Sequence, residues 1–304
     1  ERDAISNGMK TLTDKIIQIL ICPKCRAEHL SCAGAKLTCN RCSAEYPIQN
    51  SAFYFTSPHD GTIKKYEAEA GQFVNRLKSL VKKWPALFVF LTYAIGSVSY
   101  FGQKPKQTIE KLYGEKAEEK IIVNVGSGIT EVHREVINLD IFPFKNVDIV
   151  ADAASLPFKD ASVDMLISES TIEHTPNAEG AIKEMRRVVR PGGFVYISIP
   201  FVMPFHASPN DYSRLTHEGL KQKFYDFTPI KIGALGGPAS ALVTFLMYFL
   251  ALPFSVISEA AYNLATYFFM VILSPLRIFD LLFNLFPRSI EVSAFIYFIG
   301  EKRQ

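Results

Sequence analysis

Four cysteines near the N-terminus have the spacing of a metal site. Cys22 and Cys25 form one CxxC pair, and Cys39 and Cys42 form a second pair after thirteen intervening residues. Each pair offers two thiolates to one ion, and a hairpin between the pairs would complete a tetrahedral sulfur site, which suits zinc. Four protein ligands leave no open coordination position, so a structural zinc ion is predicted. The fifth cysteine, Cys32, is expected to be a small apolar residue of the hairpin.

A glycine-rich turn and an acid follow two predicted strands. Residues 121–125 form a buried strand by pattern, and the turn comes directly after it: Gly126, Ser127 and Gly128. Such a turn lets a ligand approach the backbone. The second predicted strand, residues 136–140, ends in Asp140, whose carboxylate can hold ribose hydroxyls. Glu131 replaces the third glycine of the dinucleotide fingerprint, which argues against a nicotinamide dinucleotide.

The elements that would position these residues alternate between short apolar runs and helical spacing, which is typical of a parallel sheet covered by helices. The further predicted strands are residues 147–152, 163–168, 194–199, 229–232 and 293–299. A helix is expected over residues 178–189, ended by Pro191, Gly192 and Gly193. Because only eleven residues separate Gly128 from Asp140, the helix between the first two strands is expected to be unusually short.

Six segments in this order carry a family resemblance: VGSG, NLD, ADAASLPFKDASVD, SESTIEH, EMRRVVRPGG and FVYISIPF. They closely resemble the class I S-adenosylmethionine-dependent methyltransferases of type 11, over residues 120–232 plus a final strand. The resemblance implies an α/β fold with a doubly wound Rossmann-like sheet, and S-adenosyl-L-methionine as cofactor. Asn124 stands where the family more often has an acid.

The residues that the resemblance implies for cofactor binding lie at the carboxyl ends of strands. They are Gly126, Ser127 and Gly128 beneath the methionine part, Asp140 at the ribose hydroxyls, Ile141 against the adenine face, Asp152 at the adenine amino group, the backbone of Ala153 at a ring nitrogen, and Ser168 and Glu169 at the methionine amino group and the reaction centre. The competing interpretation is a scaffold that has lost its cofactor.

Residues 206–220 follow the pattern HxxPxDYxRxTxxGL, which resembles methyltransferases that decorate bacterial surface glycans and lipids. His206, with His174 as the second candidate, could take a proton from a substrate hydroxyl, because imidazole titrates near neutral pH. Asp211 could orient His206. Equally, His206, Asp211 and Arg214 could only brace the loop over the cofactor, because methyl transfer needs little acid–base help when the acceptor is already nucleophilic.

Two apolar stretches explain the mean hydropathy of +0.12. Residues 239–275 hold one formal charge, Glu259, and residues 84–101 hold none. Because residues 293–299 are expected to return to the sheet, the longer stretch is an insertion that must come back to the side it left. Pro253 would divide it into pieces of about 14 and 20 residues, which suits a re-entrant or surface-lying pair.

The shorter stretch is expected to lie in the membrane interface, with flanking lysines at the headgroups. Its boundary aromatics are Trp84, Tyr93 and Tyr100. The alternative is that both stretches form an ordinary helical subdomain, or a homo-oligomer interface. Reduced zinc thiolates and a cytosolic cofactor favour the cytoplasmic face of the membrane, and residues 1–20 lack the pattern of a secretory signal.

The sequence of 304 residues therefore divides into six parts. They are an N-terminal extension (1–18), a zinc ribbon (19–56), linker helices with the apolar segment 84–101 (57–118), a methyltransferase core (119–237), an apolar membrane-associated insertion (238–287) and a final strand (288–304). The ribbon resembles the family that includes the small activator subunit of tRNA methyltransferases. With 21% charged residues and a net charge of +3, neither disorder nor bulk attraction to nucleic acid is expected.

Three functions fit this organisation. The favoured one is a membrane-associated methyltransferase whose partners are the lipid bilayer and a lipid-anchored acceptor, either a lipid-linked glycan or an isoprenoid-type lipid. The second is an RNA methyltransferase, since ribosomal-RNA enzymes also join a zinc ribbon to this fold, but it predicts a broad basic face with stacking aromatics. The third is a non-catalytic platform, which predicts a damaged cofactor site.

Overall fold

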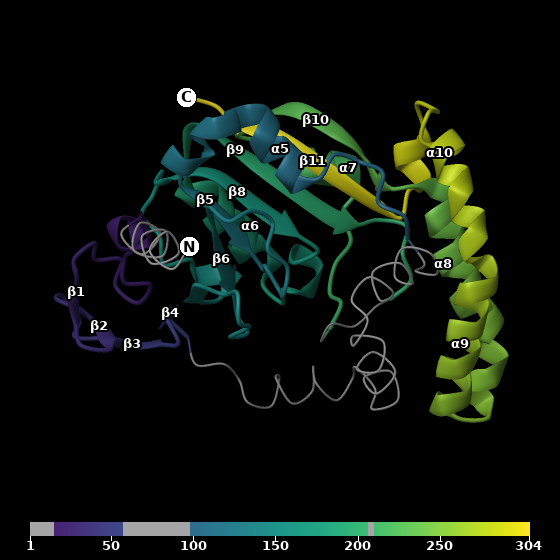
Figure 1. The fold of residues 1–304 in the computed structure, drawn as a ribbon, viewed down its shortest axis with the longest axis horizontal. Coiled ribbons are helices and arrows are strands. Elements are labelled where there is room, and N and C mark those ends of the chain that lie inside the picture. The colour runs from purple at the N-terminus through teal and green to yellow at the C-terminus, as the bar shows by residue number, and fades with distance from the viewer. Residues whose placement is uncertain (1–14, 57–97, 206–209) are drawn as a thin grey trace, which may run out of the picture.

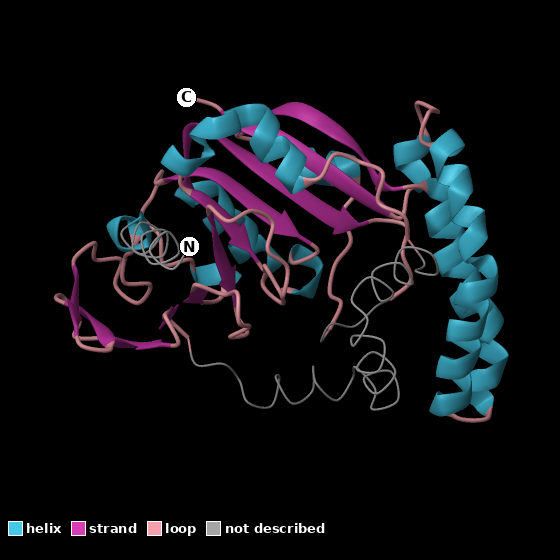
Figure 2. Cartoon of the chain, viewed as in Figure 1, coloured by secondary structure: helices cyan, strands magenta, loops and turns pink. Residues whose placement is uncertain are grey.

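A computed structural model describes residues 15–56, 98–205 and 210–304, and these residues build one large mixed α/β sheet with helices on both faces (Figures 1 and 2). The strands are β1 (Leu30–Ala33), β2 (Lys36–Cys39), β3 (Glu45–Gln49), β4 (Ala52–Tyr54), β5 (Ile122–Val125), β6 (Val136–Asp140), β7 (Ile149–Val150), β8 (Val163–Glu169), β9 (Val189–Pro200), β10 (Phe227–Gly236) and β11 (Phe295–Lys302). Their order across the sheet is β1-β2-β3-β4-β7-β6-β5-β8-β9-β11-β10.

The helices of the described residues are of two kinds. The α-helices are α5 (Pro105–Tyr113), α6 (Ala178–Val188), α7 (His217–Lys223), α8 (Pro238–Ala251), α9 (Glu259–Leu273) and α10 (Asp280–Phe283). The 3-10 turns are η1 (Gly114–Glu119), η2 (Ala153–Ser155), η3 (Ile172–His174), η4 (Leu252–Val256), η5 (Ser274–Phe279) and η6 (Ser289–Val292). Residues 15–19 are also helical.

The centre of the sheet is the parallel set β7, β6, β5, β8 and β9, followed by antiparallel β11 and β10. Every residue of β5 and β6 is buried, as expected for central parallel strands that are covered on both faces. Ile182 of α6 and Leu220 of α7 pack into one face, whereas Ile109 of α5 packs into the other. The carboxyl ends of the parallel strands meet at one edge, where open sheets bind ligands.

The short helix expected between the first two strands is absent, and that expectation was wrong. Residues 126–135 form turns and loop instead. The backbone N–H groups of Gly126 and Ser127 both donate to the carbonyl of Leu139, at 2.8 and 3.1 Å. The start of this segment is therefore tied directly to the end of β6. The helix expected over residues 178–189 ends at Val188, and β9 begins at Val189. Pro191, Gly192 and Gly193 therefore lie inside β9 and do not end the helix, as the sequence had suggested.

The four-cysteine region belongs to the same sheet as the core. β4 pairs in parallel with β7, with Phe53 opposite Ile149 and Tyr54 opposite Val150. A second link between this region and the core is an isolated antiparallel bridge that joins Leu20 to Phe158. β7 would otherwise be an exposed edge strand, so β4 covers its unpaired backbone groups.

The apolar helices stand beside the sheet as an antiparallel pair (Figure 1). α8 with η4 runs away from the sheet and α9 runs back, and in the order of the chain the pair comes after β10 and before β11. Gly236 and Phe295 are register partners, so both ends of the hairpin start from one point.

The other apolar stretch is described only at its end. Residues 98–101 are not helical, and Tyr100 forms an antiparallel bridge with Gly236. The aromatic ring of Tyr100 lies 5.5 Å from that of Phe295. Residues 84–97, with Trp84 and Tyr93, lie outside the described residues. The sequence placed Tyr100 at a membrane boundary, whereas the structure places it against the sheet.

Candidate functional site

The glycine turn after β5 has two glycines with different tasks. Gly126 and Gly128 have φ angles of +74° and +54°, a conformation that L side chains rarely adopt. A Cβ atom on Gly126 would lie 2.1 Å from Oγ1 of Thr171, whereas one on Gly128 would have no atom within 4 Å. Gly126 is therefore needed for packing against Thr171, and Gly128 leaves open space that a ligand can use.

Asp140 at the end of β6 holds this turn. Its Oδ2 accepts a 2.8 Å hydrogen bond from the N–H of Gly128, and its Oδ1 accepts one of 2.9 Å from the N–H of Phe142. Burial raises the pKa of Asp140, and the two N–H donors oppose this shift. An ionised carboxylate has about four acceptor positions, so capacity remains for hydroxyl donors such as those of a ribose.

The next predicted cofactor residues flank Asp140. Ile141 follows it directly, and 38% of this apolar residue is exposed, as a platform for a planar ring requires. Asp152 is exposed, and its Oδ1 accepts a 2.8 Å bond from the N–H of Ala154, which makes Asp152 the N-cap of η2. Ala153 begins that turn and is partly buried. The roles of Asp152 and Ala153 toward adenine stay predictions.

The end of β8 holds two predicted residues, Ser168 and Glu169. Ser168 is buried, and its Oγ has no hydrogen-bond partner. Burial raises the pKa of Glu169 to about 7, against the opposing charge of Lys104. Burial, together with the charges of Glu169 and Glu173, raises the pKa of Tyr100 to about 12. Tyr100 and Lys104 therefore belong to the surroundings of the Glu169 carboxylate, although a long sequence separation hides this.

Glu173 is the most unusual polar residue near this edge, and the sequence pointed only to its neighbour His174. Only 1% of Glu173 is exposed, and neither carboxylate oxygen has a hydrogen-bond partner. Burial raises its pKa to about 7. Burial of a carboxylate without hydrogen bonds costs stability, and such residues are characteristic of functional sites. The sequence has no hydrophobic periodicity that would indicate the burial of Glu173, because η3 is a single turn of three residues.

His174 connects Glu173 to the loop after β9. Its Nδ1 donates to the carbonyl oxygen of Asn210 at 2.5 Å, and its Nε2 lies 3.8 Å from Oε1 of Glu173. A carbonyl only accepts, so the proton of a neutral His174 sits on Nδ1. The N–H of Tyr212 also donates to the carbonyl of Glu173, at 2.7 Å. These contacts fix residues 210–212 over η3.

Asp211 forms a two-pronged ion pair with Arg214. The Arg214 guanidinium also donates to the carbonyl oxygens of Ser213 and Pro204, at 3.0 and 3.3 Å. These bonds brace the loop, which is the interpretation that the sequence weighed against a catalytic one. His206, the first candidate for a base, lies outside the described residues.

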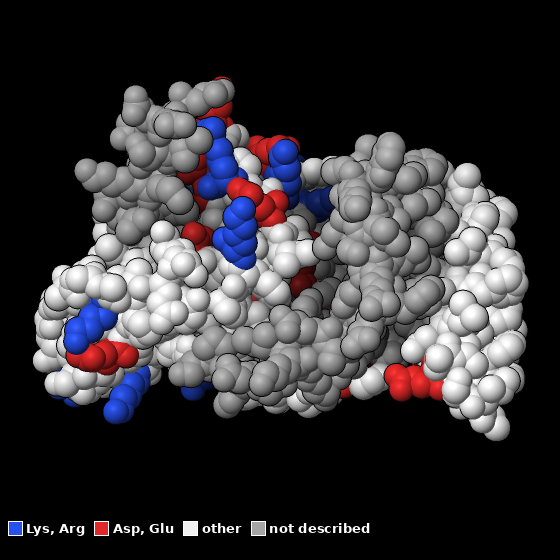
Figure 3. Space-filling model, turned by 60° about the horizontal axis from the view of Figure 1, so that its bottom comes forward, with Lys and Arg blue, Asp and Glu red and all other residues white. Residues whose placement is uncertain are grey.

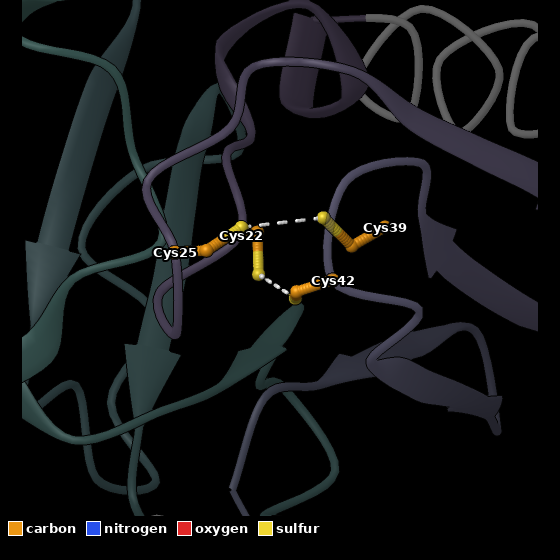
Figure 4. Close-up of side chains that lie close together, drawn as sticks. All are labelled: Cys22, Cys25, Cys39 and Cys42. Atoms are coloured by element: carbon orange, nitrogen blue, oxygen red, sulfur yellow. Dashed lines mark hydrogen bonds between the residues drawn. The ribbon is translucent and has the colours of Figure 1, made fainter.

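The four cysteine thiols converge on one point (Figure 4). All four Sγ atoms lie within 4.8 Å of one another, with Cys22 at 3.6 Å from Cys42 and Cys25 at 3.5 Å from Cys39. Tetrahedral zinc with Zn–S bonds of about 2.3 Å separates its sulfur ligands by about 3.8 Å. The cluster therefore fits zinc. Cys32 is exposed on β1 and is not part of the cluster.

The residues at the carboxyl edge also fit S-adenosylmethionine. The open space at Gly128 lies beside the carboxylate of Asp140, because the two residues are hydrogen-bonded, and the exposed side chain of Ile141 follows Asp140 in the chain. On the face of the molecule that Figure 3 shows, charged side chains lie over the core and the four-cysteine region, whereas the α8–α9 hairpin is almost entirely uncharged.

Comparisons with known proteins agree with this fold. Residues 125–197 match the methyltransferase-domain family. Over 109 residues the chain is 32% identical to the ubiquinone/menaquinone biosynthesis C-methyltransferase of Coxiella burnetii, covering 34% of this chain and 43% of that protein. Over 48 residues it is 46% identical to an uncharacterized methyltransferase of a Mycobacterium species, covering 16% and 19%. The chain thus spans less than half the length of these curated relatives.

Among solved structures, the chain is similar to phosphoethanolamine N-methyltransferase 2 of Haemonchus contortus in complex with S-adenosyl-L-methionine. The two are 18% identical with a TM-score of 0.44, over 68% of this chain and 54% of that one.

Proposed function

We propose that this chain, which contains a class I S-adenosylmethionine-dependent methyltransferase domain, methylates a lipid-anchored acceptor at the cytoplasmic face of a membrane. When bound, the cofactor would supply an electrophilic methyl group on a positively charged sulfur. The chain would hold it through Asp140 and the open turn at Gly128, and Glu169 would border the reaction centre.

One structural relationship carries the membrane part of this proposal. Pro200, at the carboxyl end of β9, is the register partner of Phe295, and Phe295 is in turn the partner of Gly236. The apolar hairpin therefore starts from the same edge of the sheet at which the cofactor residues lie. A membrane that covers the hairpin would face this edge, so an acceptor could reach the site without leaving the lipid.

The acceptor class follows from this location. A lipid tail would stay in the bilayer while the reactive group enters over residues 210–214. The relative from Coxiella burnetii is named for ubiquinone and menaquinone biosynthesis, so it provides one example of a methyltransferase whose named pathway makes isoprenoid-type lipids. A lipid-linked glycan is the other acceptor with the same anchoring.

Two residues are proposed for the proton that an oxygen or carbon acceptor must release. His206 remains the first candidate from its motif, and Glu173 is the candidate that the structure adds, because its raised pKa suits proton exchange near neutral pH. Asp211 and Arg214 would position the loop that carries His206.

The test uses S-adenosylmethionine with a labelled methyl group and membranes that contain the full chain. Label is expected in the organic extract. Mild acid then distinguishes the two acceptor classes, because it cleaves lipid-linked sugars but leaves an isoprenoid quinone intact. Asp140→Ala membranes serve as the control. Label in RNA would replace this proposal with the RNA alternative. Cofactor binding without any transfer would favour the non-catalytic platform.

A further inference from the structure

We infer that the α8–α9 hairpin crosses the entire bilayer and carries its tip, residues 252–258, to the opposite face. The inference rests on the membrane association proposed above and goes beyond it, because the sequence suggested only a re-entrant or surface-lying pair. The partner that it names is the hydrocarbon core of a membrane.

The first argument is that the hairpin buries mostly small side chains and exposes large apolar ones, which is the reverse of a water-soluble helical pair. The buried residues of the two helices are Ala239, Ser240, Ala241, Val243, Thr244, Met247, Ala251, Ala265 and Thr266. Apart from Val243 and Met247, all of these are Ala, Ser or Thr. Bulky apolar side chains point outward, among them Leu242, Phe245, Phe249, Leu264, Phe268, Val271 and Ile272. Small residues between helices and large residues outside are typical of membrane helices, whereas a helical subdomain in water would bury the large ones.

The two buried threonine hydroxyls of the hairpin are satisfied inside their own helices. Oγ1 of Thr244 donates to the carbonyl of Ser240 at 2.8 Å, and Oγ1 of Thr266 donates to that of Tyr262 at 2.9 Å. These hydroxyl donors therefore need no water, which is a requirement within hydrocarbon.

The second argument is length. The helical segments Pro238–Val256 and Glu259–Phe283 have 19 and 25 residues. At 1.5 Å per residue they measure about 28 and 37 Å, and a bilayer core is about 30 Å thick. Pro253 does not interrupt the first segment, because it lies near the start of η4, where its missing N–H is tolerated. A pair that stopped at the bilayer centre would leave about half of its apolar length in water.

The third argument is the position of the charges. Glu259 is the one formal charge between Pro238 and Leu276, and it directly follows the tip, as the first residue of α9. It is separated from Arg277, near the root, by 18 residues, or about 27 Å along the helix. A carboxylate at the bilayer centre is energetically unfavourable. In a hairpin that crosses fully, Glu259 reaches the opposite headgroups and avoids this cost.

At the root, a buried carboxylate joins the returning end of the hairpin to the start of α8. Asp280 accepts hydrogen bonds from the N–H groups of Ala239 and Ser240 and from the Ser240 hydroxyl, at 2.6, 3.1 and 2.6 Å. Its oxygens thereby satisfy the first N–H groups of α8. Exposed apolar residues run along α8 from Leu242 to Leu250 and along α9 from Leu264 to Ile272, and a lipid bilayer covers both stretches at once.

The test places single cysteines at the tip and on the core. All five native cysteines lie within residues 22–42, and Cys32→Ser removes the one outside the metal cluster. In that background Val256→Cys reports the tip, where Val256 is 90% exposed. Ile257→Cys is a second tip reporter, and Glu115→Cys, at an exposed residue, is the core control. A membrane-impermeant maleimide is applied to spheroplasts and to inverted membrane vesicles.

Both tip variants should react in spheroplasts, whereas Glu115→Cys should react only in inverted vesicles. Reaction of the tip only in inverted vesicles would overturn the inference in favour of a surface-lying pair. Reaction only after detergent would indicate a re-entrant pair. A detergent-free soluble dimer would show that a second copy covers the hairpin. Binding of S-adenosylhomocysteine to the purified chain is measured separately, so failure of the membrane inference and failure of the proposed function are distinguishable.

Discussion

The backbone N–H of Gly128 donates a 2.8 Å hydrogen bond to Oδ2 of Asp140, twelve residues further along the chain. This bond joins the turn after β5 to the end of β6, so one carboxylate both shapes the glycine turn and faces the space beside it. Loss of the carboxylate should therefore affect both the turn and the ligand.

Asp140→Ala should reduce the affinity for S-adenosylhomocysteine by about 10- to 100-fold, because one to two charge-assisted hydrogen bonds are lost. Isothermal titration calorimetry measures this directly. Asp148→Ala is the matched control. Asp148 is also a buried acid that accepts a backbone N–H, from Asn138 at 2.8 Å, but it precedes β7 and lies away from the carboxyl edge. Equal losses of affinity in both variants would contradict the role of Asp140.

Gly128→Leu should weaken cofactor binding by more than 10-fold and leave the chain folded, because its side chain enters open space at a cost of about 1–2 kcal/mol for the positive φ angle. Gly126→Ala should instead lower the melting temperature, because its Cβ would meet Thr171. Thr171→Ala in the same chain should restore part of that loss. If Gly128→Leu binds like the native chain, the open space is not the ligand site.

Glu173→Gln should remove a pH dependence of stability. Burial raises the pKa of Glu173 from 4.5 to about 7, so the folded chain binds this proton more tightly than the unfolded chain does. The resulting stabilisation is complete below pH 4.5 and is lost as the pH rises through 7. At pH 8 the variant should be more stable than the native chain, by up to about 3 kcal/mol.

Denaturant unfolding at pH 4.5, 6 and 8 measures this difference, and Glu115→Gln, at an exposed acid, serves as its control. The two chains should be alike at pH 4.5. Parallel curves for Glu173→Gln and the native chain across the whole range would show that the carboxylate is not destabilised by burial.

Zinc should bind at one ion per chain to Cys22, Cys25, Cys39 and Cys42, and Cys39→Ser should abolish it. Cys32→Ser should keep the full amount, because Cys32 is exposed outside the cluster. Elemental analysis of freshly purified protein gives the ratio. Less than half an ion per native chain, or loss of zinc in Cys32→Ser, would contradict the assignment. Since β4 extends the main sheet beside β7, chelation should also lower the melting temperature of the whole chain.

Local patterns in the sequence determined the chemistry of single positions. The spacing of Cys22 and Cys25 limits how far apart their thiols can be, so the metal cluster was predictable. The positions of Asp140 and Glu169 at strand ends were predictable as well, because a strand pattern shows where a strand ends, and parallel strands bring these ends to one edge. The alternation of strands and helices failed between Gly128 and Asp140, where a short helix was expected and the chain forms only turns and loop.

The tertiary structure decided how distant segments share one environment. The sequence does not indicate that the side chain of Thr171 requires glycine at position 126, or that the carboxylate of Glu173 is buried. Nor does it indicate that Tyr100 pairs with Gly236 at the root of the hairpin. It also could not show that β4 joins β7. Each of these contacts links residues whose separation along the chain follows no period, and their energy comes from burial and pairing that exist only after the sheet has assembled.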